Sequence, residues 1–133
     1  MRKGNGQPAK LSYGGHVLME NRNGLCVDIL ITQSTQAEHR AARSLLTRSR
    51  RRRIHPKTLG ADKGYHVKDF VAPSAHVREH RIRPHIARIG ERKTPGLDGR
   101  TTSTKGYRIS QRKTIDGVNQ HGRSNDIHLG RPR

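Results

Sequence analysis

Residues 58–65 read Thr-Leu-Gly-Ala-Asp-Lys-Gly-Tyr. A short apolar run ends there on Asp62, and a Lys-Gly-Tyr turn follows it. This pattern predicts a short buried strand over 58–62 that presents a carboxylate at its C-terminal end. Ligands of open α/β sheets bind at the carboxyl ends of strands, and Mg²⁺ prefers oxygen ligands. Asp62 is therefore a candidate metal ligand, and an aspartate that caps a turn or helix is the alternative.

Three short strands are expected before this segment, over 9–13, 16–21 and 25–32. Gly14-Gly15 and Asn23-Gly24 separate them, and Asn-Gly is the strongest short hairpin signal. The last strand alternates, so Leu25, Val27, Ile29 and Ile31 share one face. The sequence therefore predicts a three-stranded antiparallel meander, with exposed acids such as Glu20 and Asp28 on the other face.

A helix is expected next. Thr35 and Glu38 have the spacing of a capping box, and one apolar stripe comprises Ala37, Ala41, Ala42, Leu45 and Leu46. Further elements are a helix over 66–80, with Val67, Phe70 and Val71 inward, and an edge strand over 82–87. We therefore expect an α/β domain with a mixed sheet over 9–87. It is flanked by a linker at 1–8 and by a loop and largely disordered basic tail at 88–133.

Composition restricts the classes of partner and compartment. The 133 residues include 28 Lys and Arg against 10 Asp and Glu, which gives a net charge of +18. Such a charge indicates a polyanionic partner, most often nucleic acid. The sequence predicts no membrane span and no signal peptide, and its single cysteine excludes an internal disulfide framework. A cytoplasmic protein is the expectation.

A basic run follows the apolar stripe of the expected helix and supplies the candidate phosphate contacts. Six or so cations there would release as many counterions on binding DNA. A solvated helix end is the alternative interpretation. The candidate DNA-binding residues are Arg48, Arg50, Arg51, Arg52, Arg53, Lys57 and Lys63.

Three stretches together resemble bacterial insertion-sequence transposases with a DDE catalytic centre. They are residues 10–25, residues 58–65 and the Leu-Asp-Gly-Arg-Thr-Thr segment at 97–102. Gly106-Tyr107 and residues 110–112 extend the third stretch, so the resemblance covers about 10–113. It implies a ribonuclease-H-like fold and Mg²⁺-dependent cleavage and joining of DNA, in which acidic residues hold two metal ions.

By this resemblance Asp62 is the second catalytic aspartate and a metal ligand. The family's first aspartate lies on a strand before the meander, so we expect an incomplete domain that lacks this residue. The third acid belongs to an Arg-x3-Glu-x6-Lys pattern on a helix. Here Arg112, Asp116 and Arg123 have that spacing, with aspartate for glutamate and arginine for lysine. Gly117 follows Asp116 directly, which disfavours the helix.

The sequence therefore predicts a transposase fragment that binds DNA and is catalytically incomplete. A separate polypeptide could supply the missing strand, so self-association or association with an intact transposase is expected, in the bacterial cytoplasm at the nucleoid. The alternative is a basic nucleic-acid-binding protein without enzymatic activity. A folded remnant without function is a third class, which would show no DNA affinity beyond that due to charge.

Overall fold

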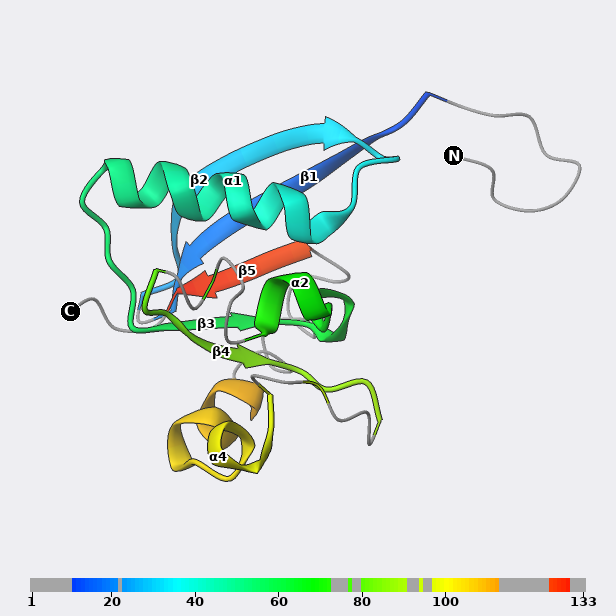
Figure 1. The fold of residues 1–133 in the computed structure, drawn as a ribbon. Coiled ribbons are helices and arrows are strands. Elements are labelled where there is room, and N and C mark those ends of the chain that lie inside the picture. Colours follow the sequence, from blue (N-terminus) through cyan, green and yellow to red (C-terminus); the bar gives the residue numbers. More distant parts are fainter. Residues whose placement is uncertain are drawn as a thin grey trace, which may run out of the picture.

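The computed structural model describes residues 11–21, 23–72, 77, 80–90, 94, 97–112 and 125–129. The fold is mixed α/β, as the sequence predicts, around a five-stranded sheet of order β2-β1-β5-β3-β4 (Figure 1). The strands are β1 (Tyr13–Glu20), β2 (Leu25–Gln33), β3 (Thr58–Ala61), β4 (Arg83–Ile86) and β5 (Asn125–Leu129). The helices are α1 (Glu38–Arg51), the 3₁₀ turn η1 (Lys63–Tyr65), α2 (Lys68–Val71) and α4 (Gly99–Thr102), and residues 105–112 are also helical.

The predicted meander is a two-stranded hairpin. β1 runs straight through Gly14 and Gly15, which pair with Thr32 and Ile31 of β2, so the expected glycine turn is wrong. These two glycines have no positive φ, whereas Gly24 has φ +68° and forms the predicted hairpin turn. Residues 9 and 10 lie outside the described residues, and 11–12 are not in a strand.

Three of the four residues on the predicted apolar face of the hairpin are exposed, namely Leu25, Ile29 and Ile31 at 61%, 53% and 67%. The fourth, Val27, is partly buried against the core, and Asp28 is buried. Helix α1 lies across β1 and β2 (Figure 1) and contacts both strands. In this hairpin the buried His16 also has a polar contact, since its Nε2 lies 2.9 Å from Thr32 Oγ1.

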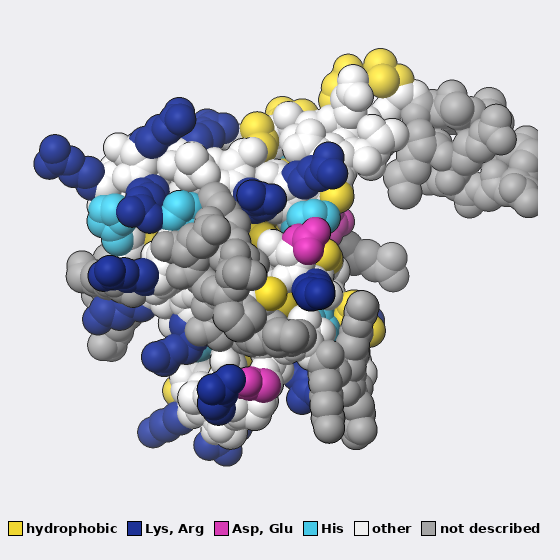
Figure 2. Space-filling model, viewed as in Figure 1, with side chains coloured by type: hydrophobic (Ala, Val, Ile, Leu, Met, Phe, Trp, Pro, Cys, Tyr) yellow, Lys and Arg dark blue, Asp and Glu magenta, His cyan; other side chains and the backbone are white. Residues whose placement is uncertain are grey.

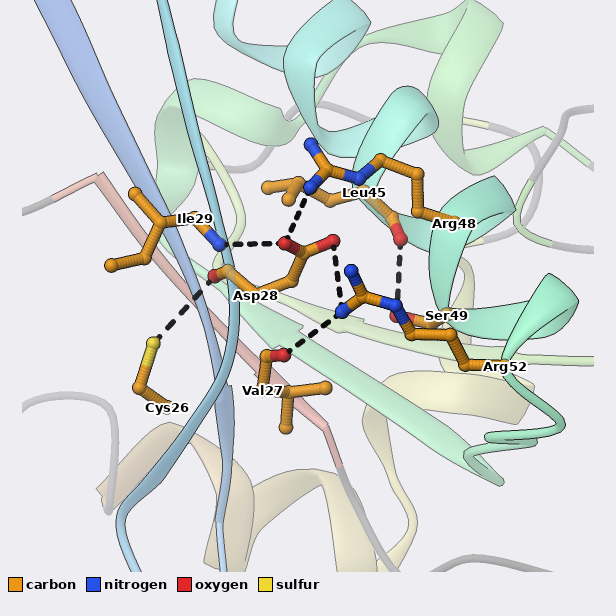
Figure 3. Close-up of polar contacts among 8 residues, drawn as sticks. All are labelled: Cys26, Val27, Asp28, Ile29, Leu45, Arg48, Ser49 and Arg52. Carbon is orange, nitrogen blue, oxygen red and sulfur yellow. Dashed lines mark hydrogen bonds and ion pairs between the residues drawn. The ribbon is translucent and has the colours of Figure 1, made fainter.

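Asp28 is the main polar link between the hairpin and α1 (Figure 3). Its side chain is 5% exposed, and Arg48 Nη2 donates to its Oδ1 at 2.8 Å. The Ile29 N–H donates to the same oxygen at 2.9 Å, and Arg52 Nη1 lies 3.7 Å from Oδ2. A buried carboxylate requires such partners, and here α1 and the backbone of β2 supply them.

Helix α1 buries four of the five residues of the predicted apolar stripe, and the fifth, Ala37, is exposed. Its buried residues are Ala41, Ala42, Leu45, Leu46 and Ser49. The predicted capping box is wrong, because the N-cap is Ala37 and no side chain caps the helix. Arg48, Arg50 and Arg51 lie in the last turn, where cations favour the helix dipole.

Strands β3 and β4 form close to the predicted ranges 58–62 and 82–87. β3 is buried from Leu59 to Ala61, and Phe70 and Val71 are fully buried in the same core cluster. The predicted helix over 66–80 is described only as α2 and as a helical residue at Val77, since 73–76 and 78–79 lie outside the described residues. β4 is an edge strand, which is where Pro84 is tolerated.

Within the range 88–133, which the sequence predicts to be loop and largely disordered tail, the described residues 99–102 and 105–112 are helical and 125–129 form a strand. α4 and the helical residues 105–112 pack beside β4, because Tyr107 donates to the Ile86 carbonyl at 2.8 Å. β5 lies between β1 and β3, parallel to the first and antiparallel to the second. No helix of the described residues is long and apolar enough to span a membrane.

His85 couples the packing of these helices to pH. It is 3% exposed, and its Nδ1 lies 2.7 Å from Ser110 Oγ. Burial, together with the charge of Arg83, lowers the pKa of His85 from 6.5 to about 4. The folded chain therefore keeps this imidazole neutral at a pH where the unfolded chain protonates it.

We expect the free energy of unfolding to fall as the pH drops from about 6.5 to about 4, because only the unfolded state takes up the His85 proton in that range. Urea unfolding at about pH 7 and about pH 4.5 measures the loss. It should shrink in His85→Gln and persist in the control His55→Gln, since His55 is exposed. Equal losses in both variants would contradict this assignment.

We expect Arg48→Met to lower the free energy of unfolding by about 1–3 kcal/mol, because it leaves the buried Asp28 carboxylate without its shortest ion pair. Arg51→Met removes an exposed arginine from the same helix end, so its cost should stay within about 0.5 kcal/mol. Denaturant unfolding compares the two variants. Similar costs would show that Asp28 does not depend on Arg48.

Candidate functional site

Asp62 stands where the sequence predicts it, directly after β3. It is the N-cap of η1, and its Oδ1 accepts a hydrogen bond from the Gly64 N–H at 2.7 Å. Tyr65, the last residue of η1, is fully buried with its ring centroid 6.0 Å from that of Phe70. The turn is thus anchored in the core, while the Asp62 side chain is partly accessible to solvent.

A second carboxylate approaches Asp62 across Gly64. The position that a Cβ on Gly64 would take lies 3.0 Å from Asp62 Oδ1 and 3.0 Å from Glu38 Oε2. Both oxygens are thus near one point, so they lie within about 6 Å of each other. Helix α1 contacts η1 through its N-terminal end, which is how Glu38 reaches this turn.

A buried histidine lies in the electrostatic range of Glu38. His16 is 2% exposed, and burial lowers the pKa of its imidazole while the Glu38 charge raises it in part. Its Nε2 lies 2.9 Å from Thr32 Oγ1, and its buried Nδ1 has no hydrogen-bond partner among the described residues. Asp62, Glu38 and His16 thus come from three separate elements.

The candidate phosphate contacts divide into two groups. Arg48 and Arg52 turn toward Asp28, and Arg52 Nη1 also donates to the Val27 carbonyl at 3.4 Å (Figure 3). Arg50 Nη1 donates to His80 Nδ1 at 2.6 Å, which leaves its charge without a counter-ion there. The remaining cations of the run, Arg51, Arg53 and Lys57, are exposed.

These cations lie at the C-terminal end of α1 and in the loop that leads to β3. Arg53 has φ +60°, in the left-handed region, where the chain turns out of the helix. Figure 2 shows Lys and Arg side chains over much of the visible face, with Asp and Glu side chains in only small groups. Lys63 is also exposed, but it belongs to η1 beside Asp62.

A second basic surface lies over α4 and residues 105–112. It surrounds a shallow depression of about 660 Å³ lined by Thr102, Lys105, Tyr107, Arg108, Gln111 and Arg112. Asp98 and Arg100, which form an ion pair of 2.8 Å, belong to the same region. This surface is a second candidate for phosphate contacts, besides the C-terminal end of α1.

Asp116, the candidate third acid, lies outside the described residues. His80 contacts Arg50 and His85 contacts Ser110, so these histidines serve different elements. Within the described part of the chain, no group of three or more His, Cys, Asp or Glu residues could hold a metal ion.

Sequence reasoning missed the positions of Glu38 and Asp28. The spacing of Glu38 from Thr35 assigned it to a capping box, and the polar character of Asp28 assigned it to solvent. A signal for Asp28 was present, since an arginine-rich helix end closely follows the strand. No local sequence pattern predicts that Glu38 lies near Asp62, because tertiary packing brings the two residues together.

Comparison with known proteins identifies a family for this chain. A family model described as "Transposase DDE domain" matches residues 2–123. Neither the curated proteins nor the solved structures include a match. Since the matched residues span most of the chain, it belongs to the family of transposase DDE domains.

Proposed function

We propose that this chain binds DNA by phosphate contacts at the C-terminal end of α1, as part of insertion-sequence transposition. The observation that carries the proposal is the set of exposed cations, Arg51, Arg53 and Lys57, which Asp28 does not neutralise. Arg50 adds a fourth charge, because its partner His80 is not acidic. Cations clustered in this way release counterions when they contact phosphates.

The family generally uses divalent metal ions, and Asp62 is the residue that would hold one in this chain. Its position directly after β3 supports this role, because ligands of open α/β sheets bind at the carboxyl ends of strands and hard cations prefer carboxylate oxygens. When bound, such an ion supplies Lewis-acid chemistry to the attacking and leaving oxygens of a phosphate displacement. The η1 turn holds the Asp62 carboxylate through the Gly64 N–H.

We propose further that the chain alone does not catalyse strand transfer. Asp116 has the spacing of the third acid, but a glycine follows it and it is shorter than glutamate. A two-metal site requires several carboxylates held in a fixed geometry. The ribonuclease-H-like architecture, the bacterial nucleoid and an association with an intact transposase belong to the same proposal.

A basic nucleic-acid-binding protein without enzymatic activity is the second candidate, and the net charge of +18 favours it.

Cleavage and strand-transfer assays with Mg²⁺ or Mn²⁺ test the proposal that the chain alone is catalytically inactive. We expect no product from the wild-type chain or from Asp62→Ala. Product from the wild type that disappears in Asp62→Ala would contradict the proposed inactivity.

The DNA interface is tested by the salt dependence of duplex binding, measured by fluorescence anisotropy. We expect the triple variant Arg51→Gln, Arg53→Gln, Lys57→Gln to lower the slope of log affinity against log salt by about 3, because each lost phosphate contact removes about 0.9. The matched control changes Arg100, Lys105 and Arg108 to Gln on the second basic surface. A slope that falls only in the control would move the interface there.

A further inference from the structure

The two edges of the five-stranded sheet are covered to different extents. At the β4 edge, side chains of residues 105–112 bind the strand. Tyr107 donates to the Ile86 carbonyl at 2.8 Å, and Gln111 Nε2 donates to the His85 carbonyl at 2.7 Å. The opposite edge is β2, whose one neighbouring strand is β1 (Figure 1). An uncovered edge presents backbone N–H and C=O groups that can pair with another strand.

Side chains close the first part of the β2 edge. Arg52 Nη1 donates to the Val27 carbonyl at 3.4 Å, and the Ile29 N–H donates to Asp28 Oδ1 at 2.9 Å. These backbone groups therefore point away from β1. The backbone groups on one side of an antiparallel strand repeat every second residue, so those of Ile31 point away from β1 as well.

The second part of the β2 edge, residues 29–33, is termed the open edge. Among the described residues, no hydrogen bond closes the outward N–H and C=O of Ile31. The Ile31 side chain is exposed, and Gly15, the residue opposite it on β1, has no side chain to cover it. The side chain of Ile29 is exposed as well. The open edge thus combines apolar side chains with free backbone groups.

The charge distribution indicates which partner fits the open edge. Residues 23–39 contain no Lys or Arg, although the chain has 28 of them and a net charge of +18. Two such basic chains repel each other over most of their surface, and lysines on edge strands oppose pairing. A strand free of cations is therefore where two copies meet at the lowest electrostatic cost. An acidic partner would find its cations elsewhere on the surface.

We propose that two copies of this chain pair through the open edge in antiparallel orientation, with Ile31 on the two-fold axis. Each Ile31 then exchanges two backbone hydrogen bonds with its copy, and the Gln33 N–H donates to the Ile29 carbonyl of the copy. The remaining groups already have partners, since the Ile29 N–H donates to Asp28 and the Gln33 carbonyl accepts from Gln36 at 2.9 Å. Such a self-complementary interface closes after two copies.

The test is sedimentation equilibrium of the full chain without DNA over a series of concentrations. We expect a monomer–dimer equilibrium that strengthens with salt, because salt screens the repulsion between the basic copies. Ile31→Lys should weaken dimerisation at least about tenfold, since it places two like charges beside each other on the axis. Circular dichroism checks that this variant folds.

Ile89→Lys is the matched control for charge. Ile89 is also an exposed isoleucine, but it follows β4 at the opposite edge of the sheet. The variant adds the same charge as Ile31→Lys and should dimerise as the wild type does. An equal loss in the two variants would contradict the assignment to the β2 edge.

The single cysteine of the chain reports the register. Cys26 is exposed and precedes the open edge, so a spin label there leaves the paired residues unchanged. With Ile31 on the axis, about ten strand positions separate the two labelled residues, which corresponds to about 33 Å between their Cα atoms. Pulsed electron paramagnetic resonance measures this distance. A pairing centred on Ile29 would give about 20 Å and would contradict the register.

A chain that stays monomeric at every concentration would overturn the proposal and leave the open edge to a strand of another protein. Dimers that Ile31→Lys does not weaken would overturn the role of the edge. Duplex binding by the same samples tests the proposed DNA contacts separately, because it should weaken with salt while dimerisation strengthens. Either proposal is therefore able to fail while the other stands.

Discussion

The docking of α1 on the hairpin through Asp28 is the interaction on which the rest of the structure depends. The carboxylate is buried at 5% exposure and is held by Arg48 from α1 and by the backbone of its own strand. Leaving this buried carboxylate unpaired would destabilise the fold, so the docking of α1 depends on the contact between Arg48 and Asp28. The apolar stripe of α1 then completes the core against Leu18 and Leu59.

This docking gives the two ends of α1 different chemistry. At the C-terminal end, Asp28 takes up Arg48 and Arg52 and leaves the following cations exposed to solvent. At the N-terminal end, Glu38 lies across Gly64 from Asp62. One helix thereby has exposed cations at one end and a carboxylate near Asp62 at the other.

Local patterns predicted the elements, and long-range pairing decided the rest. Asn23-Gly24, the stripe from Ala41 to Leu46 and the strand ending at Asp62 are all local signals, and the structure confirms them. Strict alternation placed Ile29 and Ile31 inside, but alternation cannot say which face meets a helix. The positions of Asp28 and Glu38 depend on partners far away in sequence, and so does the insertion of β5 between β1 and β3.

The central proposal is that the exposed cations at the C-terminal end of α1 contact DNA phosphates. The most direct measurement is a ¹⁵N amide spectrum of the full chain titrated with a DNA duplex. We expect DNA-induced shifts around residues 50–57. Shifts centred on residues 105–112 would contradict the proposal.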